Sequence, residues 1–155
     1  GFSIREGPAV LEVAATGGWE VLVDQQVETP ASEPELAGMT DASLVAEGDF
    51  YGIDQEGTGK AALYRLPDGR RALRLEPFVV TPNSDLFVWV SETEAPRTSE
   101  QALHSAHVQV QELTATAGAQ NYLLPDDIDA TRIRSVVIWC EPVRTAYAAA
   151  ALARS

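Results

Sequence analysis

Residues 60–76 read KAALYRLPDGRRALRLE, and this stretch decides the fold class. Its centre, Asp68-Gly69, is a dipeptide favoured at the two central positions of a tight hairpin turn, because glycine adopts a positive φ without strain. Apolar and polar residues alternate on both sides of the turn, as they do in strands with one buried face. The stretch therefore predicts an antiparallel β-hairpin with a type I′ turn.

A two-residue turn sets the pairing of this hairpin by arithmetic. If Pro67 lies opposite Arg70, then Tyr64 lies opposite Leu73, and alternate residues point to opposite faces. We therefore expect one buried and one solvated face. The buried face would hold Tyr64, Leu66, Leu73 and Leu75, and the solvated face Arg65 and Arg74 with the smaller Ala61 and Ala72.

Two later stretches are apolar at every position, Leu86–Val90 and Val136–Cys140. Each is expected to be a central strand that is buried on both faces. By alternation, Cys140 points with Ile138, whereas Trp139 points to the opposite face. Strand-like segments separated by turn signals continue from about residue 41 onwards, without βαβ alternation. We therefore predict an all-β single domain, an antiparallel β-sandwich or a barrel-like fold.

Shorter segments complete this prediction. Thr98–Leu103 is typical of a short helical turn with a hydroxyl cap, and Gln120–Leu124 of a short strand. Pro142 is expected to end the preceding strand, because proline has no N–H to donate to a ladder. Val143–Leu152 is alanine-rich, but its β-favouring residues alternate, which favours a closing strand over a helix.

The chain has 155 residues, a length that suits one domain with its own hydrophobic core. Glu28–Glu35 combines two prolines with three acids, a composition typical of extended, solvated chain. We therefore divide the sequence into an N-terminal strap or linker, residues 1–40, with one possible strand at 19–23, and a β domain, residues 41–155.

The charge of the chain excludes some partners. Eleven basic and 23 acidic residues give a net charge of -12, which repels nucleic acids and anionic lipid headgroups. No apolar stretch approaches the ~20 residues of a membrane helix, so this segment is not expected to insert into a membrane. The start at Gly1-Phe2-Ser3 suggests a processed protein or a recombinant fragment, with a possible N-terminal anchor upstream.

Two polar clusters resemble metal sites only superficially. His104 and His107 are the only histidines, and on a helix their spacing would place both on one face, but two ligands do not make a site. Asp126, Asp127 and Asp129 lack the alternating acids, the glycine and the final glutamate of a calcium loop. Nucleophile elbows and phosphate-binding glycine loops are also absent from the sequence. We therefore predict solvated surface at both clusters and no metal site.

Cys140 is the only cysteine, so it cannot close an intramolecular disulfide. It is a buried core side chain, an intermolecular crosslinker or a redox group. Unpaired cysteines often behave as small buried hydrophobes. A reactive thiolate needs a nearby cation; the adjacent Glu141 acts against it, and Arg144 would act for it. These residues alone leave the core and redox alternatives open.

Five short motifs, taken in their order along the chain, resemble the DM13 family, which is described as an extracytoplasmic electron-transfer domain. The last motif, with its Trp-Cys pair, is the most specific. The motifs are Gly48–Phe50, Gly59–Tyr64 running into Leu73–Phe78, Ser84–Val90, Gly118–Pro125 and Ser135–Pro142.

The resemblance implies that Cys140 is the redox-active group, and it carries over no other residue. It also implies an N-terminal anchor and a redox partner protein, since such domains often accompany DOMON or cytochrome-type partners. The family often has a histidine shortly before the glycine matched by Gly59, where this chain has Gln55 or Glu56. This departure puts any role of that histidine in doubt.

Our leading hypothesis is an extracytoplasmic redox module in which Cys140 forms a sulfenic acid or a mixed disulfide with a partner. The alternative is a non-enzymatic binding or structural domain for a protein or glycan, with Cys140 in its core. A third hypothesis is haem binding, with His104, His107 or Met39 as an axial ligand. The substrate, the electron donor and acceptor and the oligomeric state do not follow from the sequence.

Overall fold

A computed structural model describes residues 16–17, 30 and 32–155 of the chain. The possible strand at 19–23 lies outside these residues. Within the described part, the structure has nine strands and one short helix, and no helix has the length and apolarity to cross a membrane. The elements are β1 (Ser43–Gly52), β2 (Gly57–Arg65), β3 (Arg71–Val80), β4 (Leu86–Ser91), α1 (Ser99–His104), β5 (His107–Glu112), β6 (Gln120–Leu123), β7 (Ser135–Cys140), β8 (Thr145–Ala151) and β9 (Ala153–Arg154).

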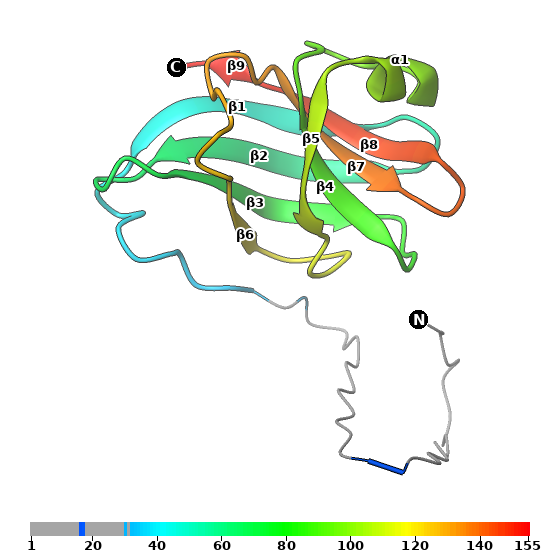
Figure 1. The fold of residues 1–155 in the computed structure, drawn as a ribbon, viewed down its shortest axis with the longest axis horizontal. Helices are drawn as coiled ribbons and strands as arrows, with labels where there is room; N and C mark the ends of the chain where they lie inside the picture. Colours follow the sequence, from blue (N-terminus) through cyan, green and yellow to red (C-terminus); the bar gives the residue numbers. More distant parts are fainter. Residues whose placement is uncertain (1–15, 18–29, 31) are drawn as a thin grey trace.

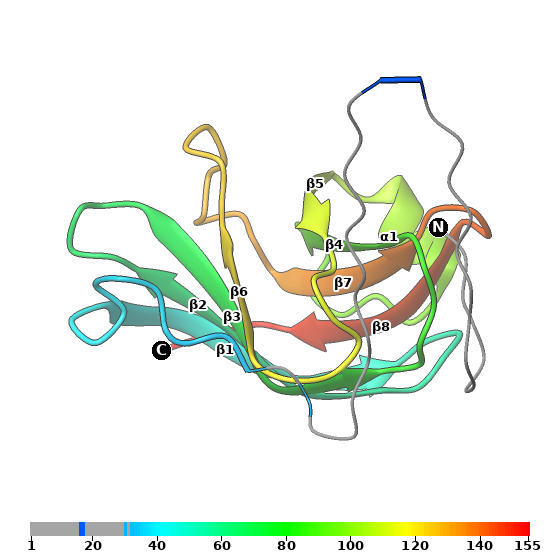
Figure 2. The same cartoon turned by 90° about the horizontal axis from the view of Figure 1, so that it is seen from below.

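The strands form one antiparallel sheet in the order β5-β4-β7-β8-β1-β2-β3-β6, and β9 adds to β1 (Figure 1). The long strand β1 joins the two halves, because it pairs with β2 over 43–49 and with β8 over 50–52. The sheet curls until it is nearly closed (Figure 2). The predicted all-β, barrel-like fold is confirmed.

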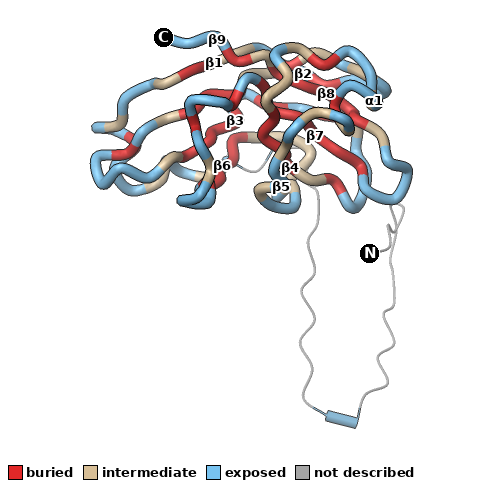
Figure 3. Tube along the Cα trace, turned by 45° about the horizontal axis from the view of Figure 1, so that its top comes forward, coloured by how far each residue is buried: buried red, intermediate tan, exposed pale blue. Residues whose placement is uncertain are grey.

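Buried residues lie along the strands of the curled sheet (Figure 3), and most of them belong to two separate clusters. The enclosed side holds the main core, to which every long strand of the sheet contributes. A second cluster lies where α1 packs on β8, and it contains Trp89, Val137, Trp139 and Ala102. Strand β7 lies between these two clusters, and all six of its residues are buried.

The predictions for the second half of the chain are confirmed. Strand β4 lies between β5 and β7, and β7 lies between β4 and β8, so both apolar stretches are central strands. Residues 120–123 and 145–151 are strands, and the chain turns between Cys140 and Thr145. The Thr98 side chain caps α1 by accepting from the backbone N of Gln101 at 3.1 Å.

The predicted register of the 60–76 hairpin is wrong by one residue. Leu63 lies opposite Leu73 and Tyr64 opposite Ala72, because the turn has three residues and not two. Gly69 is the only turn residue with a positive φ, so the connection is a type I turn followed by a left-handed glycine. A shift of one residue reverses the face of one strand relative to the other. Leu63 therefore joins Leu73 and Leu75 in the main core, and Leu66 and Tyr64 pack instead with Met39 and Ala72.

Arg74 is not solvated, which corrects a second expectation. Its exposed fraction is 8% because residues 33–34 lie against it. Its guanidinium donates to Glu76 at 2.6 Å, to the Asn121 Oδ1 at 2.7 Å and to the backbone O of Glu33 at 3.4 Å. The Glu33 carboxylate in turn accepts from the backbone N of Asn121 at 2.9 Å. These bonds hold the segment that precedes the β domain against β3 and β6.

Candidate functional site

Cys140 ends the fully buried strand β7 and faces the main core. It lies opposite Leu86 of β4 and Thr145 of β8, and its exposed fraction is 1%. Strand alternation predicts that Cys140 shares a face with Ile138 and that Trp139 points to the other face. Both predictions are confirmed, because Cys140 and Ile138 lie in the main core and Trp139 lies in the second cluster. The strand end therefore does not open the thiol to solvent.

Tyr147 lies at a β-bulge in β8, on the side of the sheet that Cys140 faces. Trp139 lies opposite Ala146 and Ile138 opposite Ala148, so Tyr147 is an extra residue without a partner on β7. Tyr147 alternates with Thr145, which lies opposite Cys140, and at the bulge both Tyr147 and Ala148 face the main core.

The Tyr147 hydroxyl connects Cys140 to the β3–β4 turn. The Asn83 Nδ2 donates to the Tyr147 Oη at 2.5 Å, which leaves the phenolic proton free for another acceptor. Burial raises the pKa of Tyr147; the hydrogen bond from Asn83 opposes this rise, and the hydrogen bond and charge of Cys140 add to it. Cys140, Tyr147 and Asn83 therefore form one connected polar site at the edge of an apolar core.

Sequence reasoning found Cys140 and missed its two neighbours. Tyr147 is part of the alternating pattern of Val143, Thr145 and Tyr147, but the sequence does not show which strand this segment pairs with or in which register. Asn83 follows Pro82 in a turn, where asparagine is common for local reasons. The contact between them spans 64 residues of sequence.

Glu141 is directed away from the thiol. Its carboxylate accepts from the indole Nε1 of Trp139 at 2.8 Å, on the side of the sheet opposite Cys140. The expected unfavourable effect of Glu141 on a thiolate is therefore reduced. Arg144 is exposed and has a positive φ of 54°, and its backbone N donates to the Glu141 carbonyl at 3.2 Å.

The structure separates the other candidate residues. His104 ends α1, His107 begins β5 and stacks on Trp89, and Met39 is buried beside Leu66. The loop that carries Asp126, Asp127 and Asp129 is exposed at all three acids. Within residues 32–155, no group of three histidine, cysteine or acidic side chains is arranged to hold a metal ion.

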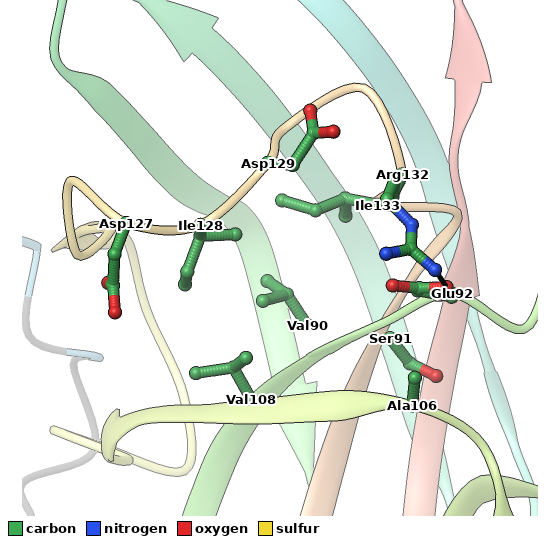
Figure 4. Close-up of a pocket in the computed structure, with 10 residues that line it drawn as sticks. All are labelled: Val90, Ser91, Glu92, Ala106, Val108, Asp127, Ile128, Asp129, Arg132 and Ile133. Atoms are coloured by element: carbon green, nitrogen blue, oxygen red, sulfur yellow. Dashed lines mark hydrogen bonds and ion pairs between the residues drawn. The ribbon is translucent and has the colours of Figure 1, made fainter.

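A hollow of about 270 Å³ lies between β4, β5 and the loop at 127–133 (Figure 4). Its wall includes Val90, Val108 and Ile133, and an ion pair joins Arg132 to Glu92 at 2.7 Å. Val90 lies opposite Val136, at the end of β7 far from Cys140. The hollow is therefore separate from the thiol site.

The pKa of Tyr147 provides a test of the Cys140 contact. Replacing Cys140 by alanine is expected to lower this pKa, because the sulfur then no longer adds to the rise, and Asn83→Ala is expected to raise it further. An NMR pH titration of ring-labelled tyrosine would measure both changes. The raised pKa of Tyr51, caused by burial and opposed by Arg97, should not change in Cys140→Ala.

The raised pKa of Tyr147 also affects the stability of the domain at alkaline pH. The folded state holds the Tyr147 proton more tightly than the unfolded chain does. The stability that this proton contributes is complete below about pH 10, the pKa of an unfolded tyrosine, and is lost as the pH rises through the folded pKa. In Cys140→Ala the loss should still begin at about pH 10, because the pKa of the unfolded chain is unchanged, but it should be smaller and should end at a lower pH. A Tyr147 pKa that is identical in the variant and the wild type would contradict the contact.

Comparison with known protein families matches residues 49–152 to the family described as Electron transfer DM13. The matched range contains Cys140, Tyr147 and Asn83. Searches of curated proteins and of solved structures returned no match. The family match covers more than half of the chain and confirms the resemblance found in the five motifs, so the chain belongs to the DM13 electron-transfer family.

Proposed function

We propose that Cys140 is the redox group of this electron-transfer domain. The observation that carries the proposal is the position of the one free thiol, which faces the same core as the Tyr147 hydroxyl and adds to the raised pKa of that tyrosine. A hydrogen bond from this hydroxyl to the sulfur would stabilise a thiolate or a sulfenate, since both bear negative charge. Membership of the DM13 family supports the electron-transfer role.

Burial distinguishes between the two reactions open to a lone thiol. A mixed disulfide requires a second sulfur to reach Cys140, and the 1% exposed fraction of this residue disfavours such an approach. A small peroxide needs less space. In that reaction the thiol and hydrogen peroxide give a sulfenic acid and water: one S–O bond forms, the O–O bond breaks, and sulfur loses two electrons to the peroxide.

Peroxide titration followed by intact-mass analysis tests this proposal. The Met39→Leu variant is the right background, because Met39 is the only other sulfur in the chain. We expect the mass to increase by one oxygen atom, and a reagent specific for sulfenic acids to prevent further oxidation. Tyr147→Phe should react more slowly, because the hydroxyl donor is lost. Cys140→Ala in the same background should gain no oxygen.

An unmodified Cys140, under conditions that oxidise a small free thiol, would exclude this reaction in the folded protein. Its 1% exposed fraction also suits the second candidate function, a binding or structural domain in which Cys140 fills the core. In that case the thiol would react only as fast as the domain unfolds. The rate of reaction should then follow denaturant concentration in the same way as the rate of unfolding.

We also propose that the domain works on the extracytoplasmic side of a membrane, behind an N-terminal anchor and with a redox partner protein. The DM13 family supports this location, and the net charge of -12 disfavours a nucleic-acid partner. Labelling of intact cells with a membrane-impermeant amine reagent tests it. The full-length protein should be labelled without lysis, and labelling only after lysis would contradict the proposal.

A further inference from the structure

Three aromatic rings stack across three neighbouring strands on the side of the sheet opposite Cys140. Trp139 of β7 stacks on Trp89 of β4, with ring centroids 4.3 Å apart and an interplanar angle of 20°. Trp89 stacks on His107 of β5, with centroids 4.0 Å apart and an angle of 7°. The three rings therefore form one continuous stack perpendicular to the strands.

The stack leads from the interior to the edge of the sheet. The exposed fraction is 0% for Trp139 and 4% for Trp89, and His107 is only partly buried. Within the described residues, β5 pairs only with β4, so His107 lies on an edge strand. The His107 Nδ1 lies 2.7 Å from the Ser105 carbonyl, which requires a proton on Nδ1 and leaves Nε2 as the basic nitrogen of the neutral ring.

The two indoles differ in their hydrogen-bond acceptors. Trp139 donates to the exposed carboxylate of Glu141 at 2.8 Å, and Trp89 donates to the Gln109 amide oxygen at 3.2 Å. An indole that loses one electron becomes a strong acid at its N–H. A carboxylate accepts that proton readily, whereas an amide does not. The innermost ring of the stack is therefore the one at which a radical is stabilised by loss of a proton.

We propose that Trp139, Trp89 and His107 form a one-electron path between the β5 edge and the residue next to Cys140. The partner is a cationic protein that carries a high-potential metal centre in its oxidised state, since a chain with a net charge of -12 attracts cations. Electron transfer becomes much slower with distance, and the ring contacts reduce the path to short steps. A buried thiol thus gains a connection to a partner too large to reach it.

The electrons and protons balance at each step. The oxidised metal centre takes one electron from Trp89 through the His107 ring, and Trp89 takes one from Trp139, whose indole proton passes to Glu141. Cys140 then reduces the Trp139 radical: one electron passes from the sulfur to Trp139, Glu141 returns the proton to the indole nitrogen, and the thiol proton is released to solvent, which gives intact Trp139 and a thiyl radical. Only this last step rests on the proposed function of Cys140, because the earlier steps involve the opposite face of β7.

A ruthenium complex bound to the His107 Nε2 tests the path by photochemical oxidation. The background variant carries His104→Gln, so that His107 is the single labelling site, and Trp19→Phe, so that the stack holds the only tryptophans. After the flash, we expect the absorption of a neutral tryptophan radical to form as the oxidised ruthenium decays. Trp89→Phe should slow this formation by more than an order of magnitude, and an unchanged rate would overturn the path.

Two further variants separate electron transfer from a purely structural role of the rings. Glu141→Gln keeps a hydrogen-bond acceptor but removes the base, so the spectrum should change to that of the radical cation; a neutral radical would contradict the role of Glu141. If Trp89→Phe does not fold, Trp139→Phe replaces it, and the neutral radical should be lost because Gln109 takes no proton. The same complex on His104, in a His107→Gln variant, is the matched control off the stack and should oxidise Trp139 far more slowly.

The variant Cys140→Ala distinguishes the two proposals. The neutral radical should form at the wild-type rate and persist longer, because the thiol that reduces it is absent. An unchanged lifetime would remove Cys140 as the end of the path and leave the aromatic steps in place. A failure to form any radical, with Cys140 still reactive towards peroxide, would instead overturn the path and leave the proposed function in place.

Discussion

Replacement of Gly59 by alanine is expected to lower the free energy of unfolding by about 3 kcal/mol or more. This cost is the sum of two effects, a strained φ and an overpacked contact. Gly59 has a φ of +110°, a conformation that L-residues with a side chain rarely adopt. A Cβ built there would lie 1.7 Å from the Pro77 carbonyl oxygen, and a backbone atom cannot move aside cheaply. The close approach occurs at an irregularity in the β2–β3 pairing.

Gly69→Ala is the matched control for this prediction. Gly69 also has a positive φ, +91°, but no atom lies within 4 Å of a Cβ built there. Its replacement should therefore cost about 1 kcal/mol, from the backbone conformation alone. Urea unfolding of both variants measures the difference, and equal costs would mean that the contact with Pro77 contributes nothing.

Replacement of Trp139 by alanine is expected to lower the free energy of unfolding by about 4 kcal/mol, as for other large buried aromatic residues. Trp139 has an exposed fraction of 0%, and its ring stacks on Trp89 in the second cluster. The change creates a cavity between β7 and α1, breaks the stack and removes the bond to Glu141. Thermal and urea unfolding, followed by circular dichroism, measure the loss.

Two controls make this result interpretable. Trp139→Phe keeps an aromatic ring in the site and should cost less than half as much, which also makes it the more useful variant for electron-transfer measurements. Val143→Ala changes a side chain that is 59% exposed in the next turn, and it should change stability by no more than about 0.5 kcal/mol. A loss below about 1 kcal/mol for Trp139→Ala would show that the site repacks.

Local patterns predicted the fold wherever burial imposed a period on the sequence. The uninterrupted apolar runs identified β4 and β7 as central strands, and alternation within β7 placed Cys140 and Trp139 on opposite faces. The hairpin register failed because Asp68-Gly69 suits both a two-residue turn and a three-residue turn, and the two differ by one residue in pairing.

The candidate site was only partly predictable. Cys140 stood out as the single cysteine, but Tyr147 lies on its face only through the pairing of β7 with β8, and Asn83 lies in a turn 64 residues before Tyr147. The aromatic stack also depends on strand pairing that the sequence does not show. His107 contacts Trp89 because β5 pairs with β4. Glu141 accepts the hydrogen bond of the Trp139 indole and lies only two residues away. The sequence predicts only its charge beside the thiol and not this hydrogen bond.

The sequence by itself determined the fold class, the central position of β7 and the opposite directions of its last two side chains, because these depend on the composition and period of single strands. Only the tertiary structure decided that the thiol is buried, that Tyr147 turns towards it and that three rings from three strands stack together. Those features depend on register, bulges and strand order, which are set by contacts between residues far apart in the chain.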